Sequence, residues 1–285
     1  MSARTPEGLT LRARLTLFAI STSFAISRAG AIAAVAANRR LHRVLPTTVR
    51  VILLVGGAIT IGVGAATTIA TGLGPGPFDV LVTGMSSAIG LPFAVSLWIL
   101  AGVLGVISAL LGKRPGPGTV LAPMIIGPMI GTMAGPLGAL LNATVDALFG
   151  SSQRSGLASV ASYATLGAAH VVGVVIIGFG AGAMIVSGLG AGTGDLLASA
   201  TSSKLGRSMP IVRTALEVGF VGLGLTLGGP AGVGTILVAL TVGPSVRFGH
   251  ARVDALISHW TDSVLETNGP DTLAGRSAMQ FKSVR

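Results

Sequence analysis

Charged residues and cysteine are what this chain has least of. Only 10% of its 285 residues are charged, whereas an ordinary soluble domain has about 25%. The absence of cysteine excludes disulfides, thiolate metal sites and cysteine catalysis, although it does not decide the compartment. Hydrophobic residues make up 51% of the chain, and its mean hydropathy is +0.82. A soluble protein this apolar would have too little polar surface to cover itself, so the composition predicts an integral membrane protein.

Acidic residues are scarce in the hydrophobic middle of the chain. Residues 48–248 contain four acids, Asp79, Asp146, Asp195 and Glu217, together with eight bases. The bases cap hydrophobic stretches, where they would face the cytoplasm and meet anionic lipid, so the formal charge of +10 indicates a bilayer partner. No basic groove with interleaved aromatic residues occurs, and nucleic acid is therefore not an expected partner.

The chain contains an internal repeat. Residues 72–128 align with residues 188–244 at a constant offset of 116, without gaps, and 18 of the 57 positions are identical. Chance similarity between apolar segments would not pair an aspartate, a Ser-Ser and a Gly-Thr in one register, so we interpret the alignment as a duplication. The identical positions include the glycines of a GLGxGxxD break in each copy, which are Gly72, Gly74, Gly76, Gly188, Gly190 and Gly192.

Both copies predict the same order of elements, in which a first apolar helix, the glycine-rich break and a short segment precede two further helices. A helix needs roughly 20 apolar residues to cross a hydrocarbon core of about 30 Å. The short segments have only 13 residues, so we expect re-entrant half-helices lined by protein or water. The expected ranges are 50–70, 78–90, 93–111 and 118–134 in the first copy and 163–186, 194–206, 209–227 and 233–247 in the second.

Lysine and arginine test which way each copy faces, because they favour the cytoplasmic side. With three spans per copy, Lys113, Arg114, Lys204 and Arg207 all fall inside, and only Arg154 falls outside. The rival arrangement, four spans per copy in parallel repeats, places Arg154 inside but leaves Lys113 and Arg114 outside. We therefore predict an all-α membrane protein of about six transmembrane helices, arranged as two inverted three-helix repeats with both termini cytoplasmic.

This topology divides the chain into five parts. The ends are basic or polar and only interrupted apolar stretches occur there, which is typical of interfacial helices. The parts are a basic N-terminal extension (1–47), the first membrane repeat (48–134), a linker (135–162), the second membrane repeat (163–248) and a cytoplasmic tail (249–285) with a short amphipathic helix at 251–265.

An aspartate follows the break in each copy, and two interpretations of it stay open. Asp79 and Asp195 each stand where a half-helix begins, so they can accept N–H bonds there and complement the helix dipole. Alternatively, broken helices of inverted-repeat transporters meet near the midplane, and their free ends bind substrate or coupling ion. The aspartates would then be ligands, joined by the polar residues Ser86, Ser87, Ser202 and Ser203.

Arg213 and Glu217 form a second candidate site. They are four residues apart on one predicted helix, so their side chains can meet. Glu217 stands well inside an apolar run and needs either a partner or a proton, and ionisable groups within membranes are frequently functional. A structural ion pair near the inner interface is the alternative, and the sequence favours neither.

The remaining polar motifs favour structural roles. The Gly-Thr turns lack the lysine of a phosphate-binding loop, so we expect tight turns with helices starting at Thr119 and Thr235. His170 is expected to be a buried, hydrogen-bonded histidine. We found no Ser/His/Asp set, no metal-ligand cluster and no catalytic acid pair, and we therefore predict neither an enzyme nor a metal or cofactor site.

The second copy resembles a known family. A GLGAGTGD break, a VRTALEV segment, GGPAGVGT and a closing GP are similar to the YczE/YyaS/YitT group of bacterial membrane proteins, and most closely to its YczE branch. The resemblance covers roughly residues 48–248 and includes Asp195, Arg213 and Glu217. The chain departs from the pattern at Ala191, where proline is common, and at Gly194. The resemblance implies a multi-pass protein of the bacterial cytoplasmic (inner) membrane whose role is poorly characterised.

Two functional hypotheses follow. The first is a transporter-like protein that moves a small solute or ion, with the acidic residues as its ligands. The second is a non-transporting membrane scaffold or regulatory protein that acts through a protein partner or as a homo-oligomer. The sequence names neither the substrate nor the partner.

Overall fold

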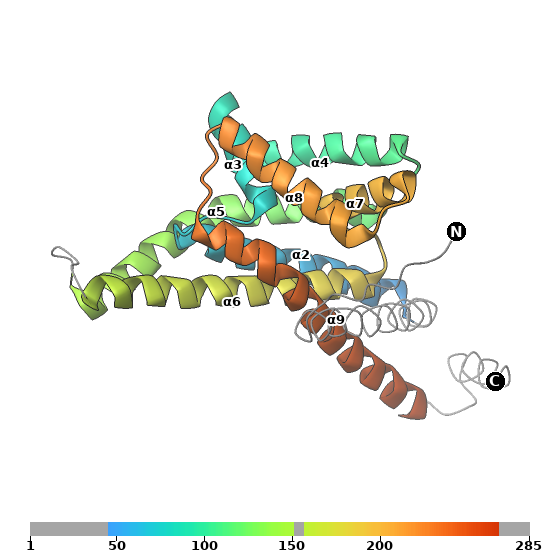
Figure 1. The fold of residues 1–285 in the computed structure, drawn as a ribbon. Coiled ribbons are helices and arrows are strands. Elements are labelled where there is room, and N and C mark those ends of the chain that lie inside the picture. The colour runs from blue at the N-terminus through green and yellow to red at the C-terminus, as the bar shows by residue number, and fades with distance from the viewer. Residues whose placement is uncertain (1–44, 151–156, 268–285) are drawn as a thin grey trace, which may run out of the picture. The chain divides into compact units, whose positions relative to one another are not determined.

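A computed structural model of the chain describes residues 45–150 and 157–267, and all of its regular elements there are α-helices (Figure 1). The all-α prediction is thus confirmed for this part of the chain. The interfacial helix expected in residues 1–47 and the end of the tail lie almost wholly outside it. The helices are α2 (Thr47–Ala70), α3 (Pro77–Ile89), α4 (Phe93–Leu110), α5 (Pro117–Phe149), α6 (Leu157–Ser187), α7 (Thr193–Leu205), α8 (Met209–Thr226) and α9 (Val233–Thr267).

The first three helices of each half match the expected ranges closely, but the fourth is longer. Helix α5 has 33 residues and α9 has 35, so α5 occupies much of the expected linker and α9 includes the expected amphipathic helix. Proline lacks an N–H and favours kinks more than complete breaks when neighbouring residues hold the helix. Helix α5 contains three prolines, Pro123, Pro128 and Pro136, and its C-terminal part bends toward α6 (Figure 1).

Five helices of the described residues are long and apolar enough to cross a membrane, namely α2, α4, α5, α6 and α8. Helix α9 is not among them, because Arg247, Arg252 and Asp254 follow its short apolar start. Helices α3 and α7 have 13 residues each, which corresponds to about 20 Å and is too short to cross. The prediction of about six spans therefore stays a prediction, whereas the short half-helices are present as expected.

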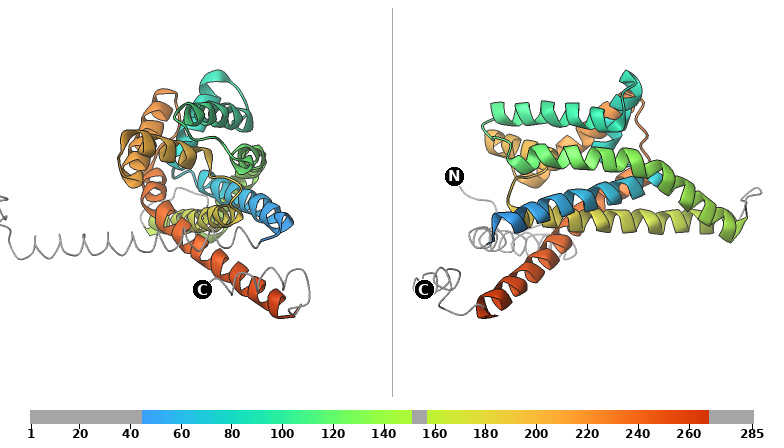
Figure 2. Two further views of the ribbon diagram at one scale, coloured as in Figure 1. Left: turned by 90° about the vertical axis from the view of Figure 1, so that its right-hand side faces the viewer. Right: turned by 180° about the vertical axis from the view of Figure 1, so that it is seen from behind.

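Helices α2 and α6 cross at the centre of the described fold, where glycines bring their backbones together (Figure 2). A methyl group on Gly57 would lie 2.7 Å from the Gly180 carbonyl oxygen, and one on Gly64 would lie 2.6 Å from that of Gly173. The two helices run in opposite directions, because Gly57, the earlier glycine of α2, contacts Gly180, the later glycine of α6. Small residues at such crossings allow the close packing that membrane helices use.

The short helix of each half packs against a long helix of the other half. Helix α3 of the first half packs against α8 of the second, while α7 of the second half packs against α4 of the first. Around the central crossing, α5 lies along α2 and α9 along α6. The apolar core between α3, α4, α7 and α8 contains Leu81, Leu97, Leu100, Leu104, Leu197 and Phe220.

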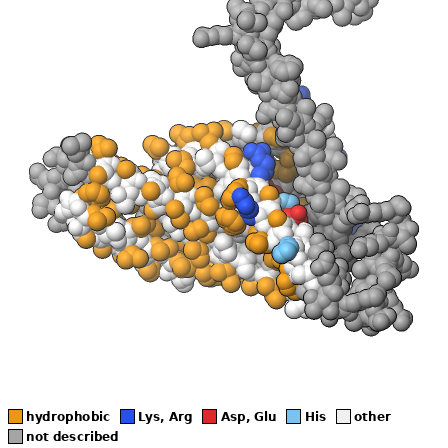
Figure 3. All heavy atoms as spheres, turned by 90° about the horizontal axis from the view of Figure 1, so that it is seen from below, with side chains coloured by type: hydrophobic (Ala, Val, Ile, Leu, Met, Phe, Trp, Pro, Cys, Tyr) orange, Lys and Arg blue, Asp and Glu red, His pale blue; other side chains and the backbone are white. Residues whose placement is uncertain are grey.

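The outer surface of the helices is strongly apolar. Large hydrophobic side chains face outward on α4, α8 and α9, where Leu110 is 83% exposed, Val218 is 67% exposed and Leu240 is 72% exposed. Figure 3 shows one face on which hydrophobic side chains dominate and charged groups gather toward one end. A soluble protein rarely exposes so continuous an apolar surface, so lipid is the natural solvent of these helices.

Candidate functional site

The two glycine-rich breaks interrupt the chain between a long helix and a half-helix. Gly72 and Gly74 have φ of 68° and 111°, and Gly188 and Gly190 have φ of 61° and 147°. These values are in the left-handed region that glycine tolerates and other residues avoid, so the glycines are what lets the chain turn here. These four positions are among the six glycines at which the sequence predicts a structural break.

The Gly-Thr turn of each half is bonded to the break of the other half. The Gly118 N–H donates to the Leu189 carbonyl at 2.9 Å, and the equivalent Gly234 N–H donates to the Leu73 carbonyl at 2.8 Å. Two of the free N–H groups at the starts of α5 and α9 are satisfied in this way. The sequence predicted helix starts at these turns but not their partners, because the donor and the acceptor of each bond are about 70 residues or more apart.

Two side chains form hydrogen bonds at the C-terminal ends of α2 and α6. His170 is fully buried, and its ring nitrogens lie 3.0 Å from Thr71 Oγ1 and 3.2 Å from the Gly234 carbonyl oxygen. This confirms the prediction of a buried, hydrogen-bonded histidine. Arg50 donates from Nε to the Ser187 carbonyl at 2.8 Å and from Nη2 to the Gly188 carbonyl at 3.2 Å. This role of Arg50 was not predicted from the sequence, because its two acceptors are more than 130 residues away along the chain.

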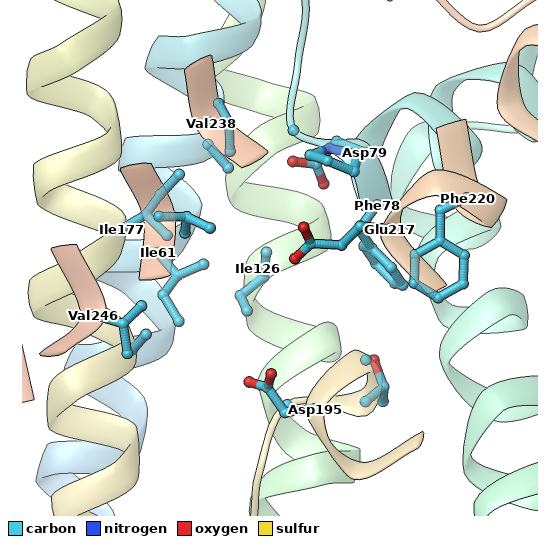
Figure 4. Close-up of a pocket in the computed structure, with 18 of the residues that line it drawn as sticks. Ile61, Phe78, Asp79, Ile126, Ile177, Asp195, Glu217, Phe220, Val238 and Val246 are labelled. Atoms are coloured by element: carbon cyan, nitrogen blue, oxygen red, sulfur yellow. The ribbon is translucent and has the colours of Figure 1, made fainter. Parts of the chain in front are cut away.

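A cavity of about 260 Å³ lies where the two breaks and the helices that follow them face the α2–α6 crossing (Figure 4). All eight described helices contribute to its wall, and most lining positions come in pairs that are 116 residues apart. Most of the wall is apolar. Its larger apolar side chains are those of Ile61, Phe78, Ile126, Ile177, Met184, Phe220, Val238, Val242 and Val246.

The wall of the cavity carries a three-residue ion-pair network. Arg213 Nη1 lies 2.6 Å from Asp195 Oδ1, and Arg213 Nε lies 3.1 Å from Glu217 Oε1. The pair between Arg213 and Glu217 is the one that their spacing predicts. Asp195 was not expected to join them, because its contact with Arg213 depends on how α7 packs against α8. The guanidinium of Arg213 is therefore shared by two carboxylates, and its single positive charge is already offset by them.

Asp79 lies in the same cavity but has no partner among the residues that the structure describes. Its carboxylate and that of Glu217 lie on the same side of the cavity in Figure 4, with the apolar side chains of α2, α6 and α9 opposite. Within the described residues, Asp79 makes no hydrogen bond and no ion pair, in contrast to Asp195. The structure therefore brings the two predicted aspartates to one cavity and leaves one of them uncompensated.

Neither aspartate caps its helix as a side-chain N-cap. Gly76 and Gly192 hold the N-cap positions of α3 and α7, and neither helix start has a side-chain cap bond. Asp79 and Asp195 lie in the first turn instead, three residues after the N-cap. Their negative charge at this position interacts favourably with the positive end of the helix dipole. This part of the capping interpretation agrees with the structure, whereas the side-chain bonds to the helix N–H groups are missing.

The four serines predicted as additional ligands lie elsewhere, and none of them lines the cavity. Ser86 donates to the Leu91 carbonyl and Ser202 to the Arg207 carbonyl, both at 2.6 Å, at the far ends of α3 and α7. Ser203 donates to the Ser199 carbonyl at 2.9 Å, and Ser87 is exposed. The aspartates and the serines occupy opposite ends of each half-helix, and the interpretation of these serines as ligands of one site is corrected accordingly.

The described residues contain no group of three or more His, Cys, Asp or Glu side chains that could hold a metal ion. The carboxylates of the cavity are spread along its wall and do not converge on one point (Figure 4). This arrangement suits a ligand that has extended size better than a single metal ion, which requires several ligand atoms at about 2.0–2.6 Å.

Comparisons with known proteins agree with this picture. A family model described as a family of unknown function (DUF6198) matches residues 8–135 and 136–251. The uncharacterized membrane protein YczE of Bacillus subtilis is 34% identical over 131 residues, which cover 45% of this chain and 61% of that protein. An uncharacterized protein of Haemophilus influenzae is 28% identical over 188 residues, which cover 66% of this chain and 77% of that protein.

The match spans less than two thirds of the Bacillus relative's length. No solved structure matches the chain. The family model nevertheless covers most of the sequence, the Bacillus relative is described as a membrane protein, and the described helices are apolar on their outer faces. The chain belongs to the YczE type of membrane protein, the family of unknown function DUF6198.

Proposed function

We propose that the protein is a transporter of the bacterial cytoplasmic membrane, which moves a small solute through the cavity between its two breaks. The observation that carries the proposal is the cavity itself. It combines two broken helices, an acidic residue in the first turn of each half-helix, and walls contributed by both halves. Solute sites of inverted-repeat transporters are formed in this way, by the free ends of discontinuous helices near the midplane.

The proposal includes an inverted arrangement of the two halves. Three observations support it. The equivalent helices α2 and α6 cross in opposite directions, and Gly57 and Gly64 of one helix meet the equivalents of each other on the other helix. The turn-to-break bonds of Gly118 and Gly234 are exchanged between the halves. The family model matches one segment in each half, as expected of two copies of one unit, which an inverted arrangement requires.

Inversion accounts for how such a cavity can open to two sides in turn. When two similar units are related by a twofold axis in the membrane plane, exchanging their conformations moves the opening from one face to the other. The apolar first part of α9 is then a sixth span, and both termini are cytoplasmic. The proposed role is transport and not catalysis.

Topology is the first test of this proposal. Cysteines introduced one at a time at positions 114, 154 and 230 should react with a membrane-impermeant maleimide from the inside for Arg114 and from the outside for Arg154 and Pro230. The chain has no cysteine of its own to interfere. Labelling of positions 114 and 230 from the same side would overturn the inverted arrangement.

Access to the cavity is the second test. Ile126 and Val242 are equivalent lining positions in the two halves. A single cysteine at either position should react from both sides of the membrane in a population that alternates, and crosslinking the halves should restrict labelling to one side. A cavity that is reached from one side only, together with a stable complex with another protein in mild detergent, would favour the scaffold hypothesis instead.

A further inference from the structure

The charges of the cavity restrict the kind of solute that it can hold. Three carboxylates, those of Asp79, Asp195 and Glu217, face it together with one guanidinium, that of Arg213. Their formal sum is therefore two negative charges. Arg213 is already bonded to two carboxylates, so an entering anion would meet acids without a free cation. A positively charged solute would instead be attracted by the excess of carboxylates in this wall.

The two halves differ at the position that matters most. Arg213 is bonded to Asp195, which stands 18 residues before it. The residue 18 positions after Asp79 is Leu97, which also lines the cavity. The second half thus provides its aspartate with a built-in cation, and the first half provides an apolar side chain without charge. The contact at Asp195 shows that a cation fits against an aspartate in the first turn of such a half-helix.

An uncompensated carboxylate in apolar surroundings is costly, and a positive group supplied by a ligand removes that cost. The rest of the wall decides what the ligand is attached to. Phe78 and Glu217 lie on the same side of the cavity as Asp79, and Ile61, Ile177 and Val238 lie opposite. The apolar side chains offer a hydrated inorganic ion no ligand atoms in exchange for its water. An apolar group attached to the positive centre would instead be buried favourably.

The volume limits the ligand's size. The cavity volume of about 260 Å³ lies just below the range found for small-molecule sites, about 300–1,000 Å³. A ligand of about ten non-hydrogen atoms, with one amine and one ring or short branched chain, fits this space.

We infer that the cavity binds a small hydrophobic organic cation, whose positive group is held at Asp79 in the place that Arg213 fills at Asp195. This inference rests on the proposed transport function for its biological meaning, since it names the substrate class of the same cavity. The binding step itself can be measured without transport.

Three probes of nearly identical shape test the inference on the purified full-length protein in detergent. They are phenethylammonium, the neutral 2-phenylethanol and the anionic phenylacetate, with binding measured by calorimetric titration and thermal stabilisation. We expect phenethylammonium to bind about thirtyfold or more tightly than 2-phenylethanol, as for a buried charge that gains its partner. Equal binding of the first two probes, tighter binding of phenylacetate, the same stabilisation by sodium alone, or no binding of any probe overturns the inference.

Variants locate the positive group. Asp79→Asn should remove the preference for phenethylammonium over 2-phenylethanol while leaving the affinity for the alcohol unchanged, and Asp79→Glu should retain the preference. Leu97→Arg introduces the built-in cation of the second half into the first and should likewise abolish amine binding. Asp254→Asn, on α9 and away from the cavity lining, is the matched control and should bind as the parent does. Unchanged amine preference in Asp79→Asn overturns the assignment.

Flux in proteoliposomes separates this inference from the transport proposal. Amine binding that depends on Asp79, without any amine flux, would uphold the site and overturn transport. Flux of a neutral or anionic solute that does not depend on Asp79 would uphold transport and overturn the substrate class.

Discussion

The two halves of the described chain share a backbone plan and differ in the few polar side chains that their cavity uses. Residues 47–149 contribute Asp79 without a partner, and residues 157–267 contribute Asp195 bonded to Arg213. The end of α6 is fastened by Arg50, and the end of α2 is fastened by His170. Their aligned positions carry Leu166 and Leu54, respectively. The two halves therefore share their order of helices but differ in charge, because Asp195 has a cation as its partner and Asp79 has none within the described residues.

The central crossing is where the two halves should behave most alike, and breaking it should have the largest effect. Gly57→Ala and its equivalent Gly173→Ala should each lower the free energy of unfolding by about 1–3 kcal/mol. The added methyl would lie 2.7 Å from the Gly180 carbonyl oxygen in one variant and 2.9 Å from that of Gly64 in the other.

Thermal unfolding in detergent measures both variants of this crossing. Gly56→Ala is the matched control on the same helix, because no atom lies within 4 Å of its added methyl. A large loss for one glycine and none for its equivalent would contradict the similarity of the two halves at the crossing.

Arg213→Leu converts the second half to the residue of the first and should be the next most damaging change. It leaves Asp195 and Glu217 in the cavity wall without their cation, at a cost of about 1–3 kcal/mol in the free energy of unfolding. The side chains of Arg213 and Asp195 are 38% and 43% exposed, which keeps the cost below that of a deeply buried pair.

Removing the whole ion-pair network tests the cause of this loss. The triple replacement Arg213→Leu, Asp195→Asn and Glu217→Ala, which makes the network apolar or neutral, should recover most of the lost stability. A triple variant as unstable as Arg213→Leu alone would show that Arg213 stabilises the fold through packing and not through its charge.

His170→Leu makes both equivalent positions leucine and should cost about 1–2 kcal/mol, because Thr71 Oγ1 and the Gly234 carbonyl lose a buried partner. Hydrogen exchange should show faster opening around residues 71–74 and little change around residues 187–190. His259→Leu, on the partly exposed later part of α9, serves as the control. An equal increase in hydrogen exchange at both breaks would mean that the hydrogen bonds of His170 do not act locally.

Asp79→Asn should have the smallest effect on stability and the opposite sign to Asp195→Asn. Replacing an uncompensated carboxylate by a neutral amide of the same shape should raise the free energy of unfolding of the ligand-free protein by roughly 0.5–1 kcal/mol, as is common where function is obtained at the expense of stability. Asp195→Asn removes a bond to Arg213 and should lower it. Both variants unfolding at lower temperature than the parent would contradict the difference between the halves.

Features that depend on neighbouring residues could be predicted from the sequence, whereas features that depend on the packing of distant segments could not. The breaks follow from local glycine chemistry, and the half-helices follow from a segment length of 13 residues, so both were predictable. The pairing of Arg213 with Glu217 follows from helical spacing. The bond between Asp195 and Arg213, by contrast, needs two helices to pack at a particular depth, which no sequence pattern specifies.

The serines show how a residue type can mislead when its position is not considered. Ser86 is seven residues after Asp79, and Ser202 is seven after Asp195. At 1.5 Å per residue, the separation along the helix is about 10 Å, too far for one small ligand at the aspartate. The helix rise alone could have excluded them. The extra length of α5 could not be predicted as easily, because the effect of Gly135-Pro136 within a helix depends on the neighbours that hold it.

The exchanged bonds between turns and breaks make each half of the chain depend on the other. The acceptor at Leu73 belongs to one half and its donor at Gly234 to the other, and the same holds for Leu189 and Gly118. A single half would therefore leave one carbonyl acceptor and one N–H donor without the hydrogen bond that the other half supplies. The two halves complete each other's backbone and form one unit of the fold.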